Sequence, residues 1–235
     1  MTGAMVDIGP AGGMSGYRSA PREASAPGLI LIQEIFGVNQ TMRKLADSYA
    51  ARGFVTLCPD LFWRQEPAVS LSDGSEADRS KAMRLLQGFN EGTGVSDLEE
   101  AAEALRQDSQ CDGTVFAVGY CLGGRLAVAL AGRNGVAAAV AYYPVALDGR
   151  ADLLTAVRTP LLVHLGEADP LVPEEAQGRL IEALSTREDA SVTVYGNAGH
   201  AFARAGSSTY VPAAAESADA ATLQFLSSRI SAAAT

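Results

Sequence analysis

The sequence is poor in the residues that build metal centres and disulfide frameworks. Its 235 residues include only three cysteines and two histidines. Cys58, Cys111 and Cys121 form no C-x-x-C pair, and an odd number of cysteines does not fit a disulfide framework. Two isolated histidines do not fit a metal site by spacing. We therefore expect no metal and no cofactor, and free thiols that suit the reducing cytoplasm.

Basic runs and long apolar runs are absent as well. The formal net charge is −9, and no Lys/Arg run supplies the electrostatic footprint of a nucleic-acid-binding protein. No stretch approaches the ~18 apolar residues of a membrane span, and the opening segment lacks the basic-then-apolar order of a signal peptide. We expect a cytoplasmic protein with no nucleic-acid or membrane partner. The oligomeric state stays open, and a monomer fits.

Short apolar runs alternate along the chain with amphipathic stretches at helical spacing. Strands are expected at 28–32, 55–58, 114–118, 136–142, 160–165 and 191–195. Helices are expected at 41–52, 76–89 and 95–107, through Leu126 and Leu130, and at 174–185 and 213–230. This alternation predicts right-handed βαβ units and a mainly parallel, doubly wound sheet. We expect one α/β domain over residues 1–235, with residues 1–25 as edge strands or loop.

The most specific local pattern is Gly119-Tyr120-Cys121-Leu122-Gly123-Gly124, which follows an expected strand and opens an expected helix. This is the context of a nucleophile elbow, here with Cys121 in the place of serine. The helix N-terminus favours a thiolate, and the backbone N–H of Leu122 can bind an oxyanion. The alternative is that Cys121 is a small core residue and the glycines only permit close packing.

An elbow of this kind needs an acid and then a histidine, in that chain order. His200 lies in a loop after the last expected strand, whereas His164 lies inside a strand and suits a structural role. Asp169 follows the strand at 160–165, although Glu167 is a nearby competitor and an aspartate beside proline also fits a simple turn. Cys121, Asp169 and His200 together predict nucleophile, orienting acid and general base.

At this point the chain resembles the dienelactone hydrolase (carboxymethylenebutenolidase) family, and the resemblance covers roughly residues 25–228. It rests on Gln33-Glu34-Ile35-Phe36-Gly37-Val38-Asn39, Cys58-Pro59-Asp60-Leu61, the elbow, and Gly199-His200-Ala201-Phe202-Ala203-Arg204. The resemblance implies the α/β-hydrolase fold and the hydrolysis of dienelactone to maleylacetate, in the bacterial breakdown of chlorinated catechols.

The resemblance also implies how the nucleophile is activated. In the family, the carboxylate matched by Glu34 sits beside the cysteine. The resting thiol is protonated and turned away from the histidine, and the glutamate takes its proton when substrate binds. Ile35 and Leu122 are implied as the N–H donors of the oxyanion hole. Taken alone, Glu34 is equally a solvated acid that follows a strand.

Substrate-binding residues follow from the same resemblance. Arg204 and Arg79 are implied to bind the substrate carboxylate, and a guanidinium can do so with two parallel hydrogen bonds. Both also fit ordinary surface charges, and Arg84 competes with Arg79 for the position. The pocket wall is implied to include Phe36, Met83 and Leu86. Three positions depart from the family: Met83 and Leu86 replace a tyrosine and a tryptophan, and Ala201 replaces a serine.

The sequence therefore predicts a hydrolase that opens a small lactone through a cysteine thioester. Two alternatives remain. The first is a broader hydrolase of small esters or lactones with another natural substrate. The second is a non-catalytic protein that uses Cys121 as a reactive thiol. Asp169 and His200 argue against the second alternative, because a thiol sensor needs no oriented base.

Overall fold

The computed structural model describes residues 3–9, 13–22, 25–133 and 135–233. The chain divides into two compact units, Met1–Phe116 and Ala117–Thr235. The division falls inside strand β5 (Cys111–Tyr120). The α/β class predicted from the sequence is confirmed, because strands alternate with helices along the chain and most strand pairs are parallel.

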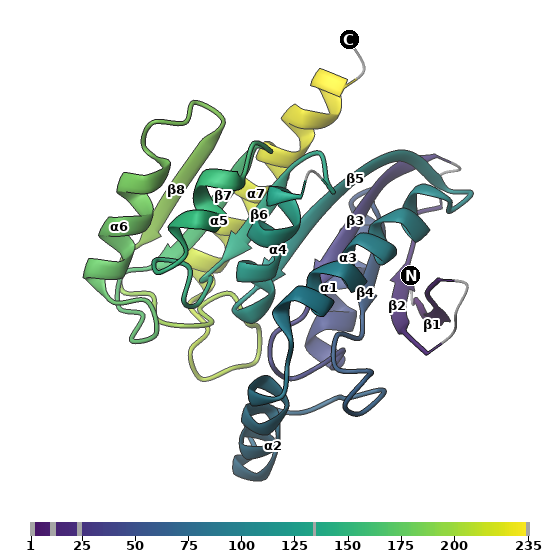
Figure 1. Cartoon of the computed structure of the whole chain (residues 1–235), viewed down its shortest axis with the longest axis horizontal. Helices are drawn as coiled ribbons and strands as arrows, with labels where there is room; N and C mark the ends of the chain where they lie inside the picture. Colours follow the sequence, from purple (N-terminus) through teal and green to yellow (C-terminus); the bar gives the residue numbers. More distant parts are fainter. Residues whose placement is uncertain (1–2, 10–12, 23–24, 134, 234–235) are drawn as a thin grey trace. The chain divides into compact units, whose positions relative to one another are not determined.

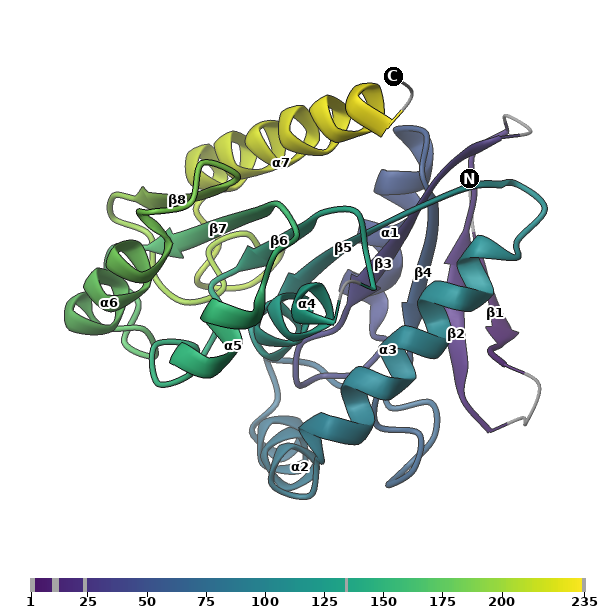
Figure 2. The same ribbon diagram turned by 45° about the horizontal axis from the view of Figure 1, so that its top comes forward.

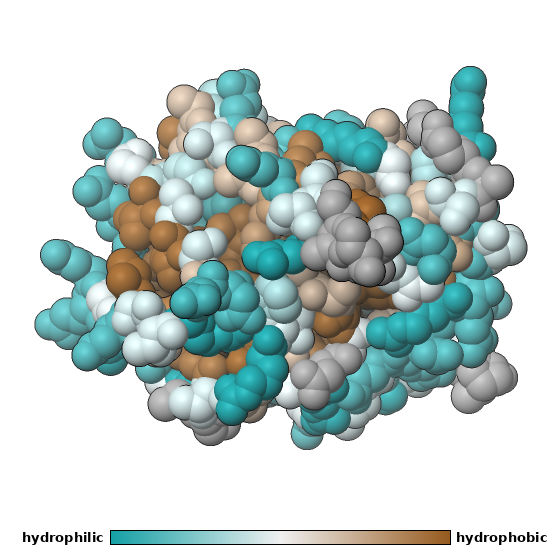
Figure 3. Space-filling model, turned by 90° about the horizontal axis from the view of Figure 1, so that it is seen from above, coloured by the Kyte–Doolittle hydropathy of each residue, from teal (hydrophilic) through white to brown (hydrophobic). Residues whose placement is uncertain are grey.

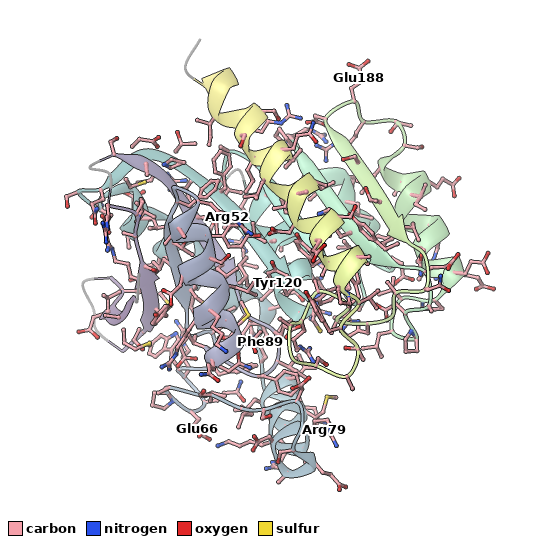
Figure 4. The ribbon with its side chains drawn as sticks, turned by 180° about the vertical axis from the view of Figure 1, so that it is seen from behind. Arg52, Glu66, Arg79, Phe89, Tyr120 and Glu188 are labelled. Atoms are coloured by element: carbon pink, nitrogen blue, oxygen red, sulfur yellow. The ribbon has the colours of Figure 1, made fainter. Side chains whose placement is uncertain are left out.

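The first unit is built on strands β1 (Ala4–Asp7), β2 (Ser15–Ser19), β3 (Ala26–Ile32) and β4 (Val55–Pro59). β3 pairs with β4 in parallel, whereas β2 runs antiparallel to both β4 and β1. Its helices are α1 (Gln40–Ala51), α2 (Glu76–Gln87) and α3 (Glu91–Arg106). α3 packs on β3 and β4, and α1 packs on β2 and β4 from the opposite face (Figures 1 and 4). Two-sided cover explains why every residue of β4 is buried.

The helices of this unit begin at polar caps that the sequence supplies. Asn39, Ser75 and Asn90 each accept a hydrogen bond from the backbone N–H three residues later, at distances of 3.0–3.2 Å. Such caps satisfy N–H groups that have no partner within the helix. They fix where α1, α2 and α3 start.

The second unit carries the end of β5 and the parallel strands β6 (Ala139–Tyr142), β7 (Leu161–Gly166) and β8 (Ala190–Tyr195). α4 (Leu122–Gly132), α5 (Ala151–Ala156) and α6 (Glu174–Leu184) lie on one face, and α7 (Pro212–Ala233) lies on the other (Figure 2). β6 and β7 are buried throughout. Loops after β5, β7 and β8 therefore meet at the carboxyl edge of one parallel sheet, where sites form in such folds.

The expected elements are found, with shifted ends. α3 begins at Glu91 rather than 95, because Asn90 caps it and two glycines in its first turns weaken the helical pattern. β6 begins at Ala139 rather than 136. The six-residue α5 is not predicted by the sequence pattern. The opening segment contains β1 and β2, and the single-domain boundary 1–235 stays a prediction.

A helix that crosses a membrane must be both long and apolar along its length. No described helix combines the length and the apolar character needed to cross a membrane. In the second unit, Leu171, Ile181 and Val194 are exposed large apolar residues. Figure 3 shows brown, apolar side chains gathered on part of one face, with teal, polar side chains around them. Exposed apolar side chains are ordinary on protein surfaces.

Candidate active site

The backbone turns sharply at Cys121, between β5 and α4. Cys121 has φ 55° and ψ −115°, a left-handed conformation that costs free energy for any residue with a side chain. Its N–H donates to the carbonyl of Tyr142 at 3.0 Å, and its carbonyl accepts from Gly124 N at 3.1 Å. The sharp turn aims the thiol away from the strand. Leu122 is the first residue of α4, where backbone N–H groups lack partners within the helix.

The glycines of the elbow are required by the closeness of its backbone segments. A Cβ on Gly119 would lie 1.9 Å from the carbonyl oxygen of Gly123. A Cβ on Gly124 would lie 2.8 Å from the carbonyl oxygen of Tyr142. Both distances are far below van der Waals contact. The glycines are therefore part of the turn that presents Cys121.

His200 and Asp169 form a direct pair. The Nδ1 atom of His200 lies 2.8 Å from Asp169 Oδ2, and the Asp169 side chain is almost fully buried. The other carboxylate oxygen of Asp169 accepts a hydrogen bond from Leu171 N at 2.8 Å. Glu167, the competing acid, accepts instead from the backbone N–H of Asn197 at 3.1 Å. Of the two acids, it is Asp169 that contacts His200.

The surroundings of His200 favour its charged form. Burial disfavours the imidazolium, but the hydrogen bonds to Asp169 and Cys121 and the negative charges of both groups outweigh burial and raise the pKa of His200 to about 10. A hydrogen bond between Cys121 and His200 thus joins the three predicted residues. Cys121 is itself 6% exposed and His200 keeps 15% of its side-chain surface.

This contact differs from what the resemblance implies for the resting thiol. The family's resting cysteine is turned away from the histidine, whereas Cys121 here hydrogen-bonds to His200. In the described conformation the Cys121 thiol therefore faces the His200 imidazole.

One residue near His200 was not singled out from the sequence. Tyr143 follows β6 with φ 37° and is fully buried. Its ring packs edge-on against the imidazole of His200 at 5.1 Å, and against Phe202 at 5.5 Å. Its N–H donates to the carbonyl of His164 at 2.7 Å. An aromatic residue at the end of a central strand is an ordinary core pattern, so periodicity alone does not reveal this contact.

His164 has the structural place expected for it. It is fully buried in β7, with Nε2 3.0 Å from Thr222 Oγ1 and Nδ1 3.0 Å from the Tyr195 hydroxyl. Thr222 in turn lies 2.7 Å from the hydroxyl of Tyr142. This buried chain of hydrogen bonds ties α7 to β6, β7 and β8. Burial lowers the pKa of His164 to about 3.

The low pKa of His164 predicts acid-sensitive stability. An unfolded histidine takes a proton near pH 6.5, whereas folded His164 does so only near pH 3. Between these values the unfolded state binds the extra proton, so this residue's contribution to stability falls as pH falls, by up to about 1.4 kcal/mol per pH unit. Denaturant unfolding of wild type and His164→Gln at about pH 7 and about pH 4.5 measures this. The wild type should lose more stability than the variant, and parallel losses would contradict the assignment.

Glu34 and its neighbours lie at the end of β3 in the first unit. Glu34 and Phe36 are buried, and Ile35 is half-buried. Gln33, also buried, donates from Nε2 to the carbonyl of Glu34 at 3.3 Å and accepts from Leu61 N at 3.2 Å. Gln33 therefore fixes the segment that carries Glu34. A polar glutamine directly after the apolar run 28–32 is the signal in the sequence that points to such a role.

The predicted substrate-binding residues come from both units. Arg79, Met83 and Leu86 lie on α2, where Arg79 and Met83 are exposed (Figure 4). Arg79 donates to the backbone carbonyl of Asp73. Arg204, half-buried, follows His200 in the second unit, and its N–H donates to the carbonyl of Ala201 at 2.9 Å. The pocket wall formed by these residues stays a prediction.

Comparison with known proteins extends the likeness to most of the chain. The chain is 39% identical over 207 residues to carboxymethylenebutenolidase from Pseudomonas putida, with 88% of each chain covered. It is 36% identical over 215 residues to carboxymethylenebutenolidase 1 from Cupriavidus pinatubonensis, with 92% of each covered.

Solved structures agree with these relatives on the fold. The crystal structure of a candidate dienelactone hydrolase from Klebsiella pneumoniae subsp. pneumoniae is similar with a TM-score of 0.84 at 24% identity, covering 96% of this chain and 98% of that one. This likeness shows the α/β-hydrolase fold. The sequence model of the Dienelactone hydrolase family matches residues 14–230. The chain therefore belongs to the dienelactone hydrolase family and is a hydrolase.

Proposed function

We propose that this chain opens the ring of a small lactone, dienelactone, to maleylacetate through a thioester on Cys121. The observation that supports this mechanism best is the set of contacts from Cys121 to His200 and from His200 to Asp169. Relatives named carboxymethylenebutenolidase support the substrate class. Cys121, His200 and Asp169 are the nucleophile, the base and the orienting acid of the proposal.

In the first half of the reaction the Cys121 thiolate attacks the lactone carbonyl carbon. The carbonyl oxygen becomes an oxyanion, which the N–H groups of Ile35 and Leu122 stabilise in this proposal. The intermediate collapses by breaking the ring C–O bond, and the imidazolium of His200 protonates the leaving oxygen. The raised pKa of His200 keeps the proton on this residue at neutral pH, and the attack consumes the thiolate charge that helps to raise the pKa, so the proton is then given up more readily.

In the second half, neutral His200 takes a proton from water, and the resulting hydroxide attacks the thioester. The C–S bond breaks, the acid product forms, and the proton on His200 again faces a thiolate. Once the thiolate is acylated, its charge no longer raises the pKa of His200. His200 therefore holds its proton beside the free thiolate, and once the thiolate is acylated its lower pKa leaves more of the neutral form that can accept a proton from water. Asp169 holds the ring so that Nε2 faces the reaction.

Glu34 is proposed to accept a proton from the thiol when substrate binds, as in the family. The contact between Cys121 and His200 supports a second route, in which His200 takes that proton directly. The two routes differ in where the thiol proton goes. In both, the thioester forms at Cys121.

A broader hydrolase of small esters or lactones is the second candidate function. Met83 and Leu86 stand where family members with dienelactone activity carry a tyrosine and a tryptophan, and Met83 is 47% exposed. These substitutions favour bulkier or less polar substrates. A kinetic comparison of cis- and trans-dienelactone with simple aryl esters separates the candidates. A higher kcat/KM on an aryl ester than on both lactones would favour the broader enzyme.

The two arginines give the proposal a prediction about charge. Arg204→Ala and Arg79→Ala should each raise KM for an anionic lactone by roughly ten- to a hundredfold, because a charge-assisted hydrogen bond contributes ~1.5–3 kcal/mol. A neutral aryl ester should be hardly affected. Lysine should not fully restore binding, because an ammonium lacks the planar fork of a guanidinium.

Arg84→Ala tests the competing assignment, because Arg84 lies on the same exposed helix as Arg79 and competes with it for this role. The measurement is kcat/KM for one anionic and one neutral substrate in each variant. Equal losses on both substrates would show that the arginines do not recognise a carboxylate.

A further inference from the structure

Gln177 is a buried polar residue on α6 that neither the sequence patterns nor the family resemblance singles out. It is 5% exposed. Its side-chain Nε2 lies 2.9 Å from the carbonyl oxygen of Gly166, 2.8 Å from that of Val172 and 3.4 Å from that of Glu167. A single amide thus donates to both ends of one loop. Buried polar side chains are nearly always hydrogen-bonded, and this one bonds to backbone carbonyls.

The loop that Gln177 holds is the one that carries Asp169. It leaves β7 at Gly166 and reaches α6 after Val172. Inside it, Asp169 N donates to the carbonyl of Gly166 at 3.2 Å, and Val172 N donates to the carbonyl of Asp169 at 3.2 Å. Gly166 and Val172 thus each share a backbone hydrogen bond with Asp169. The carbonyls of the same two residues accept the shortest hydrogen bonds from Gln177.

A second set of contacts ties this loop to the one that carries His200. Glu167 N donates to the carbonyl of Tyr195 and Ala168 N donates to the carbonyl of Ala198, both at 2.9 Å. A Cβ on Gly166 would lie 2.5 Å from the oxygen of Ala198, so the two loops are in close contact. The separation of Asp169 and His200 thus depends on the shape of the loop that Gln177 closes.

We infer that Gln177 is a positioning residue, which holds the loop from Gly166 to Val172 so that Asp169 stays within hydrogen-bond distance of His200. The inference rests on the proposed function for its catalytic consequence, since Asp169 and His200 are the acid and base of that proposal. Without the Gln177 amide, two buried carbonyls lose their side-chain donor and the loop relaxes. Even a displacement of about 1 Å at a catalytic group lowers rates greatly.

The test uses the fact that the chain has only two histidines. With carbon-labelled histidine, NMR titration yields one signal each for His164 and His200, and His164→Gln assigns them. His164 stays neutral above pH 4, because burial lowers its pKa to about 3. In Gln177→Met, the His200 signal should titrate at a lower pH than in wild type, because the Asp169 hydrogen bond that raises the pKa of His200 is weakened. kcat should fall by about tenfold or more with KM nearly unchanged.

Thr159→Val is the matched control. Thr159 is also buried in the second unit, and its side chain donates to the carbonyl of Ala131 in α4 at 3.1 Å rather than to a carbonyl of the Asp169 loop. This variant should lose similar stability and leave both the titration and kcat unchanged. If Gln177→Met does not fold, Gln177→Asn keeps an amide of shorter reach and should shift the titration in the same direction.

The outcomes separate this inference from the proposed function. A wild-type titration of His200 in either folded Gln177 variant would overturn the positioning role. Equal changes of kcat in the Gln177 variant tested and in Thr159→Val would also overturn the positioning role. If Cys121→Ala stayed active while Gln177→Met still shifted the titration, the proposed mechanism would fail and the coupling of Gln177 to the Asp169–His200 pair would stand.

Discussion

Replacing Cys121 by alanine is expected to lower kcat/KM on every lactone and ester substrate to the background rate, a loss of about ten-thousandfold or more. Alanine removes the sulfur that forms the proposed thioester, and no other described group lies in the elbow to replace it. The fold should be retained, because alanine at φ 55° carries the same backbone strain as cysteine. The measurement is kcat/KM beside the midpoint of thermal unfolding.

The other two cysteines are the controls for this prediction. Cys58 is buried in β4, and Cys111 lies at the start of β5 with its sulfur 3.8 Å from the carbonyl of Thr114. Cys58→Ala and Cys111→Ala should keep most of the activity, with Cys58→Ala less stable because its side chain is fully buried. Near wild-type turnover in Cys121→Ala would show that the nucleophile lies elsewhere.

His200→Ala has the second-largest expected effect, a loss of several orders of magnitude in kcat. The variant removes the group that protonates the leaving oxygen and activates water, and it leaves the Asp169 carboxylate without its partner at 2.8 Å. Substrate binding should change little, because His200 acts in the two proton-transfer steps and is not proposed to hold the bound substrate. Single-turnover kinetics should show that both acylation and deacylation are slow.

His164→Gln distinguishes a lost base from a general loss of structure. It alters the other histidine, which is fully buried and hydrogen-bonded on both ring nitrogens. This variant should reduce stability and keep most of the activity of the folded protein. A comparable catalytic loss in both histidine variants, with both well folded, would contradict the assignment of His200 as the base.

The sequence predicts the fold well where its signals are local. Apolar runs placed the central strands, and polar caps agree with the starts of α1, α2 and α3. The six-residue α5 was not predicted, because so short a helix carries too little periodicity to detect. The order of the strands in the sheet was not predicted either, since parallel pairing depends on contacts between residues far apart in the chain.

The candidate site likewise has parts that local sequence patterns predict and parts that depend on long-range packing. The elbow is a local pattern, and its context of strand and helix predicted the turn at Cys121. The choice of Asp169 over Glu167 rested on chain order, and the contact with His200 required the packing of two loops. Tyr143 and Gln177 lie in ordinary core patterns of a strand end and a helix. Only the three-dimensional contacts reveal that Tyr143 packs on His200 and that Gln177 bonds to the loop that carries Asp169.

The most direct test of the central claim is to trap the acyl-enzyme. Wild type is mixed rapidly with an excess of an activated aryl ester, quenched in acid within the first turnover, and analysed by intact mass and peptide mapping. The proposal predicts one added acyl group per chain, on the peptide that contains Cys121, with the chemical lability of a thioester. His200→Ala, incubated for longer, provides a second sample if turnover in wild type is too fast to trap, because an activated ester leaves without an acid whereas deacylation still lacks its base. An acyl group on any other residue would contradict the account, as would steady turnover with no covalent intermediate in either protein.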